Sequence, residues 1–223
     1  SLGPITGGGR INLRHLGCSK FEKFIFHLTR NIMVPLLYRL SCKIIRWRSL
    51  EVRPATPSVA RALGFMSKTP RAIEADTTLF EIGVINKTQK ERKIDLVCYV
   101  GPHPLKNTKL TVSVSNRLAE AGYVISVIGS VPKNIHLHKD IKYYFSLTRD
   151  EVISLIGHSV AILSLSLEEA GFFTFEAAAC GCFILCLPST GGAALPGAKE
   201  LVLKTETVTE EVLYQRCDDI MKK

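Results

Sequence analysis

The sequence lacks long hydrophobic runs, a secretory signal and a regular pattern of cysteines. No apolar run in its 223 residues reaches the ~20 residues that a membrane-spanning helix needs. The first four residues have neither the basic nor the apolar segment of a secretory signal. The seven cysteines are odd in number and follow no disulfide framework, which favours a reducing compartment. We therefore expect a cytoplasmic protein without a membrane-spanning segment.

The composition is that of a globular protein, with 46% hydrophobic and 22% charged residues. Its net charge of +9 is concentrated at one end of the chain. Residues 1–53 contain ten Lys and Arg against two Glu, whereas the rest of the chain is almost neutral. Any basic surface for a partner should therefore belong to the N-terminal part.

Two basic amphipathic helices are predicted in this part, one over residues 19–30 and one after Pro35. The apolar stripe of the second is formed by Leu36, Leu40, Ile44 and Trp47. Such helices occur on anionic membrane surfaces, which would make residues 19–48 a peripheral anchor on the inner membrane face. They also occur as ordinary domain helices with their basic residues in water. Phe21, Phe24 and Trp47 lie on the apolar stripes and are expected in the core, which argues against nucleic acid as a partner.

From residue 94 onward, strand and helix patterns alternate. Apolar runs predict strands over residues 94–100, 123–128, 141–145, 160–165 and 183–187. Helices are predicted over residues 108–121, 148–157, 172–180 and 207–221. Thr148 with Glu151 forms a capping box, and Thr207 or Thr209 should open the last helix. This alternation predicts an α/β fold with a doubly wound, Rossmann-like parallel sheet.

Two carboxylates, Glu168 and Glu176, are eight residues apart across a predicted strand-to-helix junction. In open α/β sheets ligands bind at such junctions, because strand ends leave a crevice and helix N-termini present free N–H groups. A carboxylate accepts two hydrogen bonds, which suits the vicinal hydroxyls of a sugar. A second interpretation stays open from spacing alone. Glu168 and Glu169 would then be charges at a helix N-terminus, and Glu176 an ordinary surface residue of the helix.

The segment around these carboxylates resembles the E-x7-E region of retaining GT-B glycosyltransferases of the family 4 type (group 1). The matching positions are Glu168, Gly171, Glu176, Ala177, Ala179, Cys180, Gly181, Gly191 and Gly192. The resemblance implies that Glu168 lies by the donor sugar and that Glu176 holds the ribose. It also implies that the backbone between them, including Gly171 and Phe172, approaches the sugar and the diphosphate, where Gly191 and Gly192 could add N–H groups.

Two weaker landmarks resemble the back half of the N-terminal domain in the same family. They are a G-P-x-x-G-G segment at residues 3–8 and the sequence E-I-G-V at residues 81–84. The resemblance implies a partial Rossmann-like, acceptor-side domain over residues 1–85, with Gly7, Gly8 and Gly9 in its loop. A polar linker follows at residues 86–93, and residues 94–223 form the C-terminal nucleotide-sugar-binding domain. We expect the chain to be a fragment that lacks the first part of the N-terminal domain.

The loop after the strand at residues 94–100 should hold the phosphate end of the site. It contains Gly101, Pro102, His103 and Lys106, where the family usually has an Arg and a Lys that grip the diphosphate. Lys106 takes the place of that Lys, although a solvated loop lysine is the alternative. Pro102 stands in place of the Arg, which should weaken donor binding. His103 could substitute if it is protonated.

Cys180, Cys182 and Cys186 have a C-x-C-x3-C spacing that is not a zinc spacing. We expect buried free thiols there and no metal site. The resemblance likewise implies no cofactor, only a nucleotide-sugar as substrate.

Two functional hypotheses follow. The first is a retaining, metal-independent glycosyltransferase of the hexosyltransferase type, which moves a sugar from a nucleotide-sugar to a glycan or lipid-linked acceptor. Glu168 and Lys106 would be its catalytic residues, and polysaccharide biosynthesis its setting, because the family commonly builds bacterial surface polysaccharides. The second hypothesis is a truncated or degenerate relative that binds a nucleotide-sugar or a partner without turnover.

Overall fold

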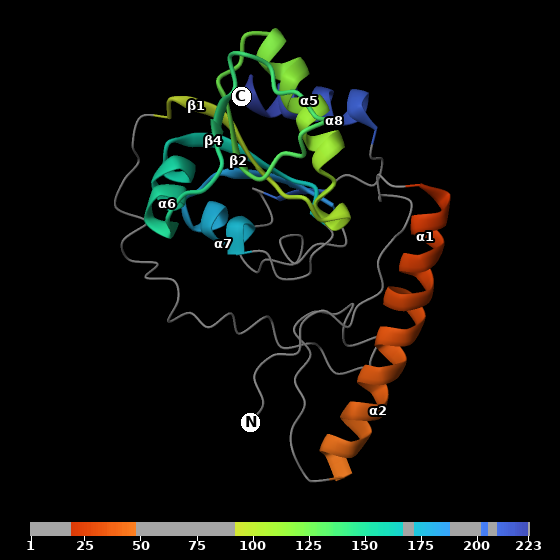
Figure 1. Ribbon diagram of the computed structural model, residues 1–223. Coiled ribbons are helices and arrows are strands. Elements are labelled where there is room, and N and C mark those ends of the chain that lie inside the picture. Colours follow the sequence, from red (N-terminus) through yellow and green to blue (C-terminus); the bar gives the residue numbers. More distant parts are fainter. Residues whose placement is uncertain (1–18, 48–91, 167–171, 188–201, 205–208, 223) are drawn as a thin grey trace.

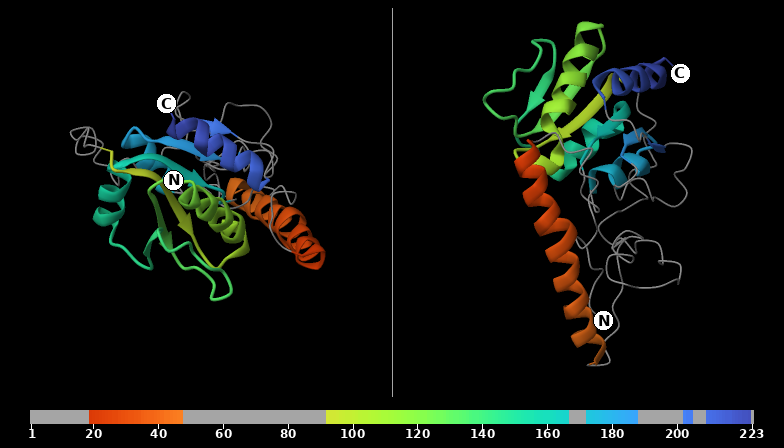
Figure 2. Two further views of the ribbon diagram at one scale, coloured as in Figure 1. Left: turned by 90° about the horizontal axis from the view of Figure 1, so that it is seen from above. Right: turned by 90° about the vertical axis from the view of Figure 1, so that its right-hand side faces the viewer.

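The computed structural model describes residues 19–47, 92–166, 172–187, 202–204 and 209–222. They form two parts, an α/β body and a long helical arm (Figure 1). Figure 2 shows in two further views how the arm extends away from the body. Among the described residues, no helix has both the length and the apolar character that crossing a membrane requires.

The body is built on a six-stranded sheet in the order β3-β2-β1-β4-β5-β6. All five neighbouring pairs are parallel. The strands are β1 Ile94–Val100, β2 Ile125–Gly129, β3 Lys142–Tyr144, β4 Ser159–Ser164, β5 Phe183–Cys186 and β6 Val202–Lys204. The chain switches direction across the sheet between β1 and β4, which is the arrangement that leaves a crevice at the carboxyl ends of these two strands. The predicted doubly wound sheet is confirmed.

Helices cover both faces of this sheet. They are α5 Thr108–Glu120, α6 Arg149–Gly157, α7 Phe172–Ala179 and α8 Glu210–Met221. In Figure 1, α5 and α8 lie above the sheet, and α6 and α7 lie below it. Because both faces are covered over the middle of the sheet, the central strands β1, β2 and β4 appear in the sequence as mainly apolar runs and not as alternating ones.

Each face has its own hydrophobic core. Leu96 and Cys98 of β1 point toward α5 and α8, where they meet Leu118 and Leu213. Val97, between them, points toward α6 and α7 on the other face. Leu96, Leu118 and Leu213 are completely buried, and each such side chain contributes about 1.5–3 kcal/mol by leaving water.

The helix ends follow the predicted caps. The Thr148 hydroxyl accepts from the Glu151 N–H, and the Glu151 carboxylate accepts from the Thr148 backbone, which completes the capping box. The Thr148 backbone N–H and, to a smaller extent, the Thr148 hydroxyl donate to the Glu151 carboxylate, and these two hydrogen bonds lower the pKa of Glu151. Thr209 is the cap of α8, so of the two candidates the later one is right. The last turn of α6 ends at His158, whose Nδ1 lies 2.7 Å from the Ser154 carbonyl oxygen.

Gly129 ends β2 in a conformation that other residues rarely adopt, with φ of 109°. A Cβ at this position would stand 2.0 Å from the carbonyl oxygen of Val100, the last residue of β1. Such an approach is impossible for a side chain, so the close contact of the two strand ends requires glycine here.

The arm consists of α1 Lys20–Phe26, a π-helical segment η2 His27–Met33, and α2 Val34–Trp47. It begins at Ser19, which forms a capping box with Glu22. The sequence predicted two separate helices with a break before Pro35, and this was wrong, because helix continues through the whole arm. Pro35 falls where the hydrogen-bond pattern changes from π to α, so its missing N–H interrupts a ladder that changes register there in any case.

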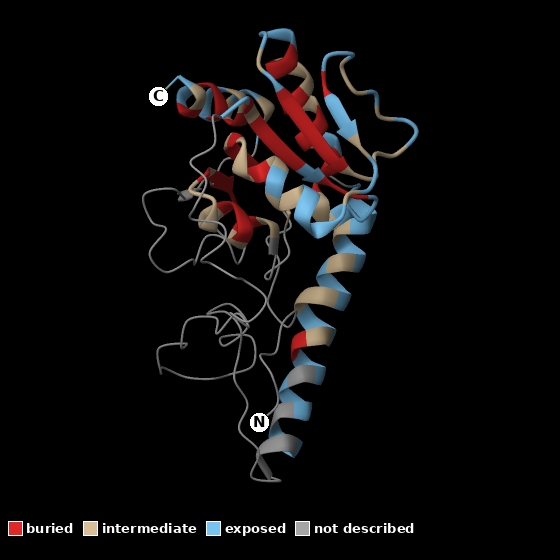
Figure 3. Cartoon of the chain, turned by 90° about the vertical axis from the view of Figure 1, so that its left-hand side faces the viewer, coloured by how far each residue is buried: buried red, intermediate tan, exposed pale blue. Residues whose placement is uncertain are grey.

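Much of the apolar surface of the arm is exposed, as Figure 3 shows. Phe21 is 73% exposed and Phe24 is 61% exposed, so the expectation that these two rings lie in the core is wrong. Leu36, Leu40 and Ile44 of α2 are each more than half exposed. The amphipathic pattern was recognised correctly, but a pattern does not specify what covers the apolar face.

Candidate functional site

The expected site residues fall into two groups. Gly101, His103, Lys106, Phe172 and Glu176 belong to the described residues. The remaining expected site residues lie outside the described residues and are Glu168, Gly171, Gly191, Gly192, Gly7, Gly8 and Gly9. The described part of the site therefore consists of the loop after β1 and of helix α7.

The loop between β1 and α5 is held tightly at both ends. The N–H of buried Gly101 donates to the Thr108 hydroxyl at 3.0 Å, and that hydroxyl donates to the Gly101 carbonyl. Asn107 adopts a left-handed conformation with φ of 49°, and its side-chain amide donates to the Leu165 carbonyl at 2.9 Å. Since Leu165 directly follows β4, this bond joins the carboxyl ends of the two central strands.

Lys106 closes a short 3-10 turn, η4 Pro104–Lys106, in this loop. Its aliphatic stem lies against Gly101, where a Cβ would come within 3.3 Å of the Lys106 Cγ. Its Nζ stands over the ring of Tyr99, 4.8 Å from the centroid. A cation above an aromatic face contributes about 0.5–1 kcal/mol at an exposed position. Its contacts with Gly101 and Tyr99 therefore hold Lys106 in position, whereas the alternative interpretation expected a solvated loop lysine.

Tyr99 links this loop to helix α7. It lies near the carboxyl end of β1 and is 40% exposed. Its ring centroid is 5.8 Å from that of Phe173, in the first turn of α7. Tyr99 was not predicted from the sequence, although a large aromatic residue one position before the end of a mainly apolar strand was an available signal. Through Tyr99 and Phe173, Lys106 and α7 belong to the same edge of the sheet.

Glu176 lies in the middle of α7 and is only 6% exposed. Its Oε1 accepts from Nε of Arg149, the first residue of α6, at 3.2 Å. The interpretation of Glu176 as an ordinary surface residue is therefore wrong. A carboxylate that loses water needs a charged or hydrogen-bonding partner, and Arg149 provides it. Arg149 was not predicted from the sequence, because no local pattern shows that the start of α6 lies against the middle of α7.

His103 precedes η4 and caps it. Its Nδ1 accepts a hydrogen bond from the Leu105 N–H at 3.2 Å. A ring nitrogen that accepts cannot carry the proton, so the neutral ring is protonated at Nε2. His103 therefore offers an N–H donor without being protonated twice, which differs from the expectation that it would need a positive charge.

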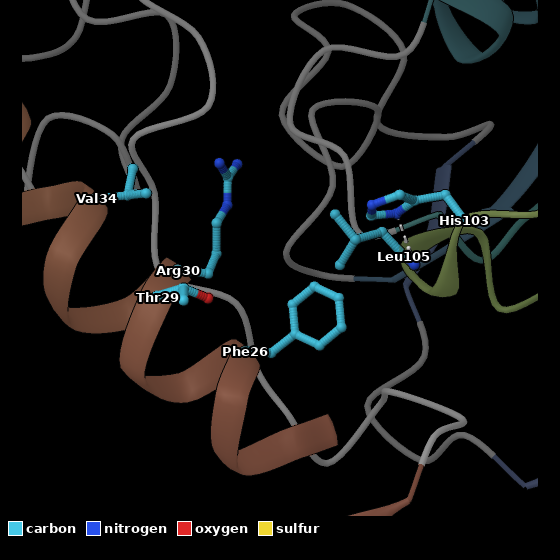
Figure 4. Close-up of a pocket in the computed structure, with 6 residues that line it drawn as sticks. All are labelled: Phe26, Thr29, Arg30, Val34, His103 and Leu105. Carbon is cyan, nitrogen blue, oxygen red and sulfur yellow. Dashed lines mark hydrogen bonds between the residues drawn. The ribbon is translucent and has the colours of Figure 1, made fainter. Parts of the chain in front are cut away.

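The face of the arm that meets the body encloses a pocket with this loop. The pocket has a volume of about 400 Å³ and is lined by Phe26, Thr29, Arg30, Val34, His103 and Leu105. Phe26 meets His103 edge to face, with ring centroids 6.3 Å apart. Figure 4 shows the helix with Phe26, Thr29, Arg30 and Val34 on one side and His103 with Leu105 on the other.

The described residues do not bring three or more His, Cys, Asp or Glu side chains together in a way that could hold a metal ion. The side chains of five cysteines are described, all as free thiols. Burial raises the pKa of Cys182 to about 12 and that of Cys180 to about 11. The expectation of buried free thiols in this region is confirmed for Cys182 and Cys186, and Cys180 is partly exposed.

Comparison with known proteins gives a likeness of fold. No family model and no curated protein matches the sequence. An alpha-glucosyltransferase solved with UDP and a 13-mer DNA containing an HMU base has a TM-score of 0.51 at 10% identity, over 89% of this chain and 61% of its own. The glycosyltransferase WaaG, involved in lipopolysaccharide biosynthesis, has a TM-score of 0.49 at 14% identity, over 79% of this chain and 48% of its own. AviGT4, a glycosyltransferase involved in avilamycin A biosynthesis, has a TM-score of 0.49 at 12% identity, over 76% and 59%.

The chain thus spans between about half and three fifths of the length of these three structures. At such low identity the likeness concerns the fold. The expected α/β fold class with a Rossmann-like parallel sheet is confirmed by the observed sheet, and it agrees with the fold likeness to the alpha-glucosyltransferase at a TM-score of 0.51.

Proposed function

We propose that this chain is the donor-binding part of a glycosyltransferase and takes a nucleotide-sugar as its substrate. One observation carries the proposal. At the carboxyl edge of a parallel sheet lie a lysine whose position is fixed by its contacts, Lys106, and a buried carboxylate, Glu176. Tyr99 contacts both Lys106 and Phe173, which is on the same helix as Glu176. The fold likeness to solved glycosyltransferases and the resemblance around residues 168–181 support the same conclusion.

In this proposal Glu176 accepts hydrogen bonds from the ribose hydroxyls. Arg149 engages Oε1, and because a carboxylate accepts several hydrogen bonds, it can bind a hydroxyl while it stays paired. Lys106 stabilises the negative charge that develops on the leaving diphosphate. Glu168 orients the donor sugar, and the backbone at Gly171, Phe172, Gly191 and Gly192 provides N–H groups to the phosphates and sugar. Gly101 belongs to the donor loop without donating, because its N–H is bound to the Thr108 hydroxyl.

The reaction we propose is a retaining transfer that needs no metal ion, to a glycan or lipid-linked acceptor. The acceptor side would include Gly7, Gly8 and Gly9 in the N-terminal part. The exposed apolar residues of α2 among basic ones support a contact with an anionic membrane surface through residues 19–48. That contact would place the protein on the cytoplasmic face of a membrane.

The test of the donor site is isothermal titration with UDP, GDP and ADP. Glu176→Gln removes the negative charge that the ribose hydroxyls would contact. It should weaken nucleotide binding about 10-fold, because one hydrogen bond to a charged group is lost. Glu120→Gln is the matched control, because Glu120 is an exposed residue at the end of α5, and it should leave affinity unchanged. Binding of no nucleotide, or equal affinities in both variants, would contradict the proposal.

The loop also favours a second function, binding of a nucleotide-sugar without turnover. Pro102 stands exposed in the phosphate loop and has no N–H to donate. Incubation of the bound nucleotide-sugar with the protein, followed by analysis for free nucleotide, distinguishes the two. Release of nucleotide above the rate of a Lys106→Met variant supports an enzyme, and binding with no release supports a sensor or scaffold.

A further inference from the structure

The pocket between the arm and the body contains a cation that has no counter-charge among the described residues. Arg30 of η2 lines it, and the Nε of Arg30 is buried with no hydrogen-bond partner among the described residues. A buried donor left without a partner costs about 1–3 kcal/mol, and more when the group is charged. Such a group is expected to acquire its acceptor when a ligand binds.

The other lining residues provide no such acceptor. The hydroxyl of Thr29 donates to the Ile25 carbonyl at 2.8 Å and so is used within the helix. Phe26, Val34 and Leu105 are apolar. Thus none of the six lining residues in the described part of the chain is acidic. The pocket is positive and partly apolar, which favours an anionic ligand.

His103 provides a second donor from the opposite wall. Its Nδ1 is occupied by the Leu105 N–H, so its proton is on Nε2. In Figure 4 the Arg30 side chain stands off the helix while His103 faces the helix from the loop. A guanidinium and a neutral imidazole N–H across one pocket are suited to an oxyanion.

The position of the pocket indicates which oxyanion. His103 and Leu105 belong to the same loop as Gly101 and Lys106, at the carboxyl end of β1. In residues 101–107 the only permanent cation is Lys106, because Pro102 and the other positions bring none. A diphosphate carries more charge than one lysine balances, and the planar guanidinium of arginine binds phosphate oxygens in pairs.

We propose that Arg30 and His103 form a phosphate subsite, so that the helical arm supplies the guanidinium that the β1–α5 loop lacks. The proposal rests on the function proposed above, which it extends by naming the residues that hold the phosphate. The phosphate is either that of the nucleotide-sugar donor or that of a lipid-linked acceptor. The pocket volume of about 400 Å³ lies in the range of small-molecule sites.

The experiment is isothermal titration of the full chain with inorganic pyrophosphate at low ionic strength. Arg30→Gln should raise the pyrophosphate Kd about 10-fold or more, because a hydrogen bond to a charged group is lost. Arg39→Gln removes the same charge from an exposed position of the same arm and should change the Kd less than about 2-fold. Arg30→Lys, which keeps the charge without the planar fork, should lie between them.

His103 is tested in the same way. His103→Gln retains a side-chain N–H and should bind pyrophosphate more tightly than His103→Ala. Thermal unfolding of each variant establishes that it is folded. No binding of pyrophosphate to the wild-type chain, or equal binding to the Arg30→Gln and Arg39→Gln variants, would overturn the proposal.

Two further titrations separate this subsite from the donor site and assign its source. If Glu176→Gln weakens uridine and UDP while Arg30→Gln leaves UDP and pyrophosphate unchanged, the subsite is wrong and the donor site stands. If pyrophosphate binding depends on Arg30 but no nucleotide binds, the proposed phosphate subsite is supported and the proposed donor site is contradicted. Displacement of pyrophosphate by UDP assigns the subsite to the donor, and displacement by farnesyl diphosphate alone assigns it to a lipid-linked acceptor.

Discussion

Arg149 and Glu176 connect two helices on the same face of the sheet, Nε to Oε1 at 3.2 Å. Glu176 is almost fully buried, whereas Arg149 is about half exposed. The pair therefore holds the N-terminus of α6 against α7, and it fixes the carboxylate on which the proposed ribose contact depends.

Removal of the arginine should destabilise the fold. Arg149→Gln leaves a buried carboxylate without its cation, and we expect a loss of about 1–3 kcal/mol, less than for a fully buried pair because Arg149 is half exposed. Urea unfolding measures it, with Arg216→Gln, an exposed position on α8, as the control that should change stability by less than ~0.5 kcal/mol. The double variant Arg149→Gln/Glu176→Gln should recover part of the loss, and simple additivity of the two single variants would show that the residues are not coupled.

Asn107 should tolerate glycine better than alanine. Both substitutions remove the bond to the Leu165 carbonyl, which should cost about 1–2 kcal/mol. Alanine must in addition adopt the left-handed conformation at φ of 49°, which adds about 1 kcal/mol. Urea unfolding of Asn107→Gly and Asn107→Ala measures the difference, and equal stabilities would show that the backbone at this position changes its conformation on substitution.

Gly129→Ala should be among the most damaging single substitutions in the body. The new Cβ would meet the Val100 carbonyl oxygen, so the end of β2 must move away from β1, and we expect a loss above ~3 kcal/mol. Gly157→Ala is the matched control. It ends α6 with open space around its Cα, and it should gain up to about 1 kcal/mol from helix propensity. A Gly129→Ala protein with the wild-type melting temperature would contradict the close approach of the two strands.

The described cysteines should react slowly in the folded protein. Burial raises the pKa of Cys98 and Cys182 to about 12 and that of Cys180 to about 11, so each thiol stays protonated at pH 8. In a Cys18→Ser/Cys42→Ser variant, a thiol reagent should label Cys180 first and all five thiols only in guanidinium. Rapid labelling of Cys98 or Cys182 in the native protein would contradict the burial.

The same shifts make stability fall in alkali. The thiols have higher pKa values in the folded protein than in the unfolded chain. Their contribution to the free energy of unfolding is therefore complete below the unfolded-state pKa of ~8.5, and it is lost progressively as the pH rises toward 11. Guanidinium unfolding between pH 8 and pH 10.5 measures this. The slope should decrease when Cys180 is replaced by serine, because one of the raised groups is then absent.

The body of the fold could be predicted from sequence because its strands are covered on both faces. The run at residues 94–100 is almost wholly apolar and matches β1 without an error at either end. Thr148 with Glu151 fixed the start of α6 in the same local way. Strand β6 was missed because three residues carry too little pattern to distinguish a strand from a loop.

The arm shows the limit of a periodic pattern. Its helical character was predicted, but not its continuity through Pro35, which depends on a π-helical segment that no simple spacing indicates. Nor does an apolar stripe state what it packs against. Phe26 contacts His103, whereas Phe24, two residues earlier, is largely exposed.

The candidate site could be predicted where a charged residue follows a recognisable strand in the same segment of the chain. Lys106 and Glu176 each follow a strand, and the sequence placed both at the carboxyl edge of the sheet. Arg149, Tyr99 and Arg30 were not identified, because each reaches the site from an element whose neighbours are set by strand order and helix packing. Contacts between segments far apart in the chain are the part that local patterns cannot contain.

The central place of β1 has a consequence for the chain while it is being made. One edge of β1 pairs with β2, which follows soon after it, but the other edge pairs with β4, after β3 and α6 have been synthesised. Until residues 159–164 leave the ribosome, this mainly apolar strand has an open row of N–H and C=O groups, and such an edge recruits other chains. A nascent chain stalled between β1 and β4 is therefore expected to aggregate and not to persist as half a sheet.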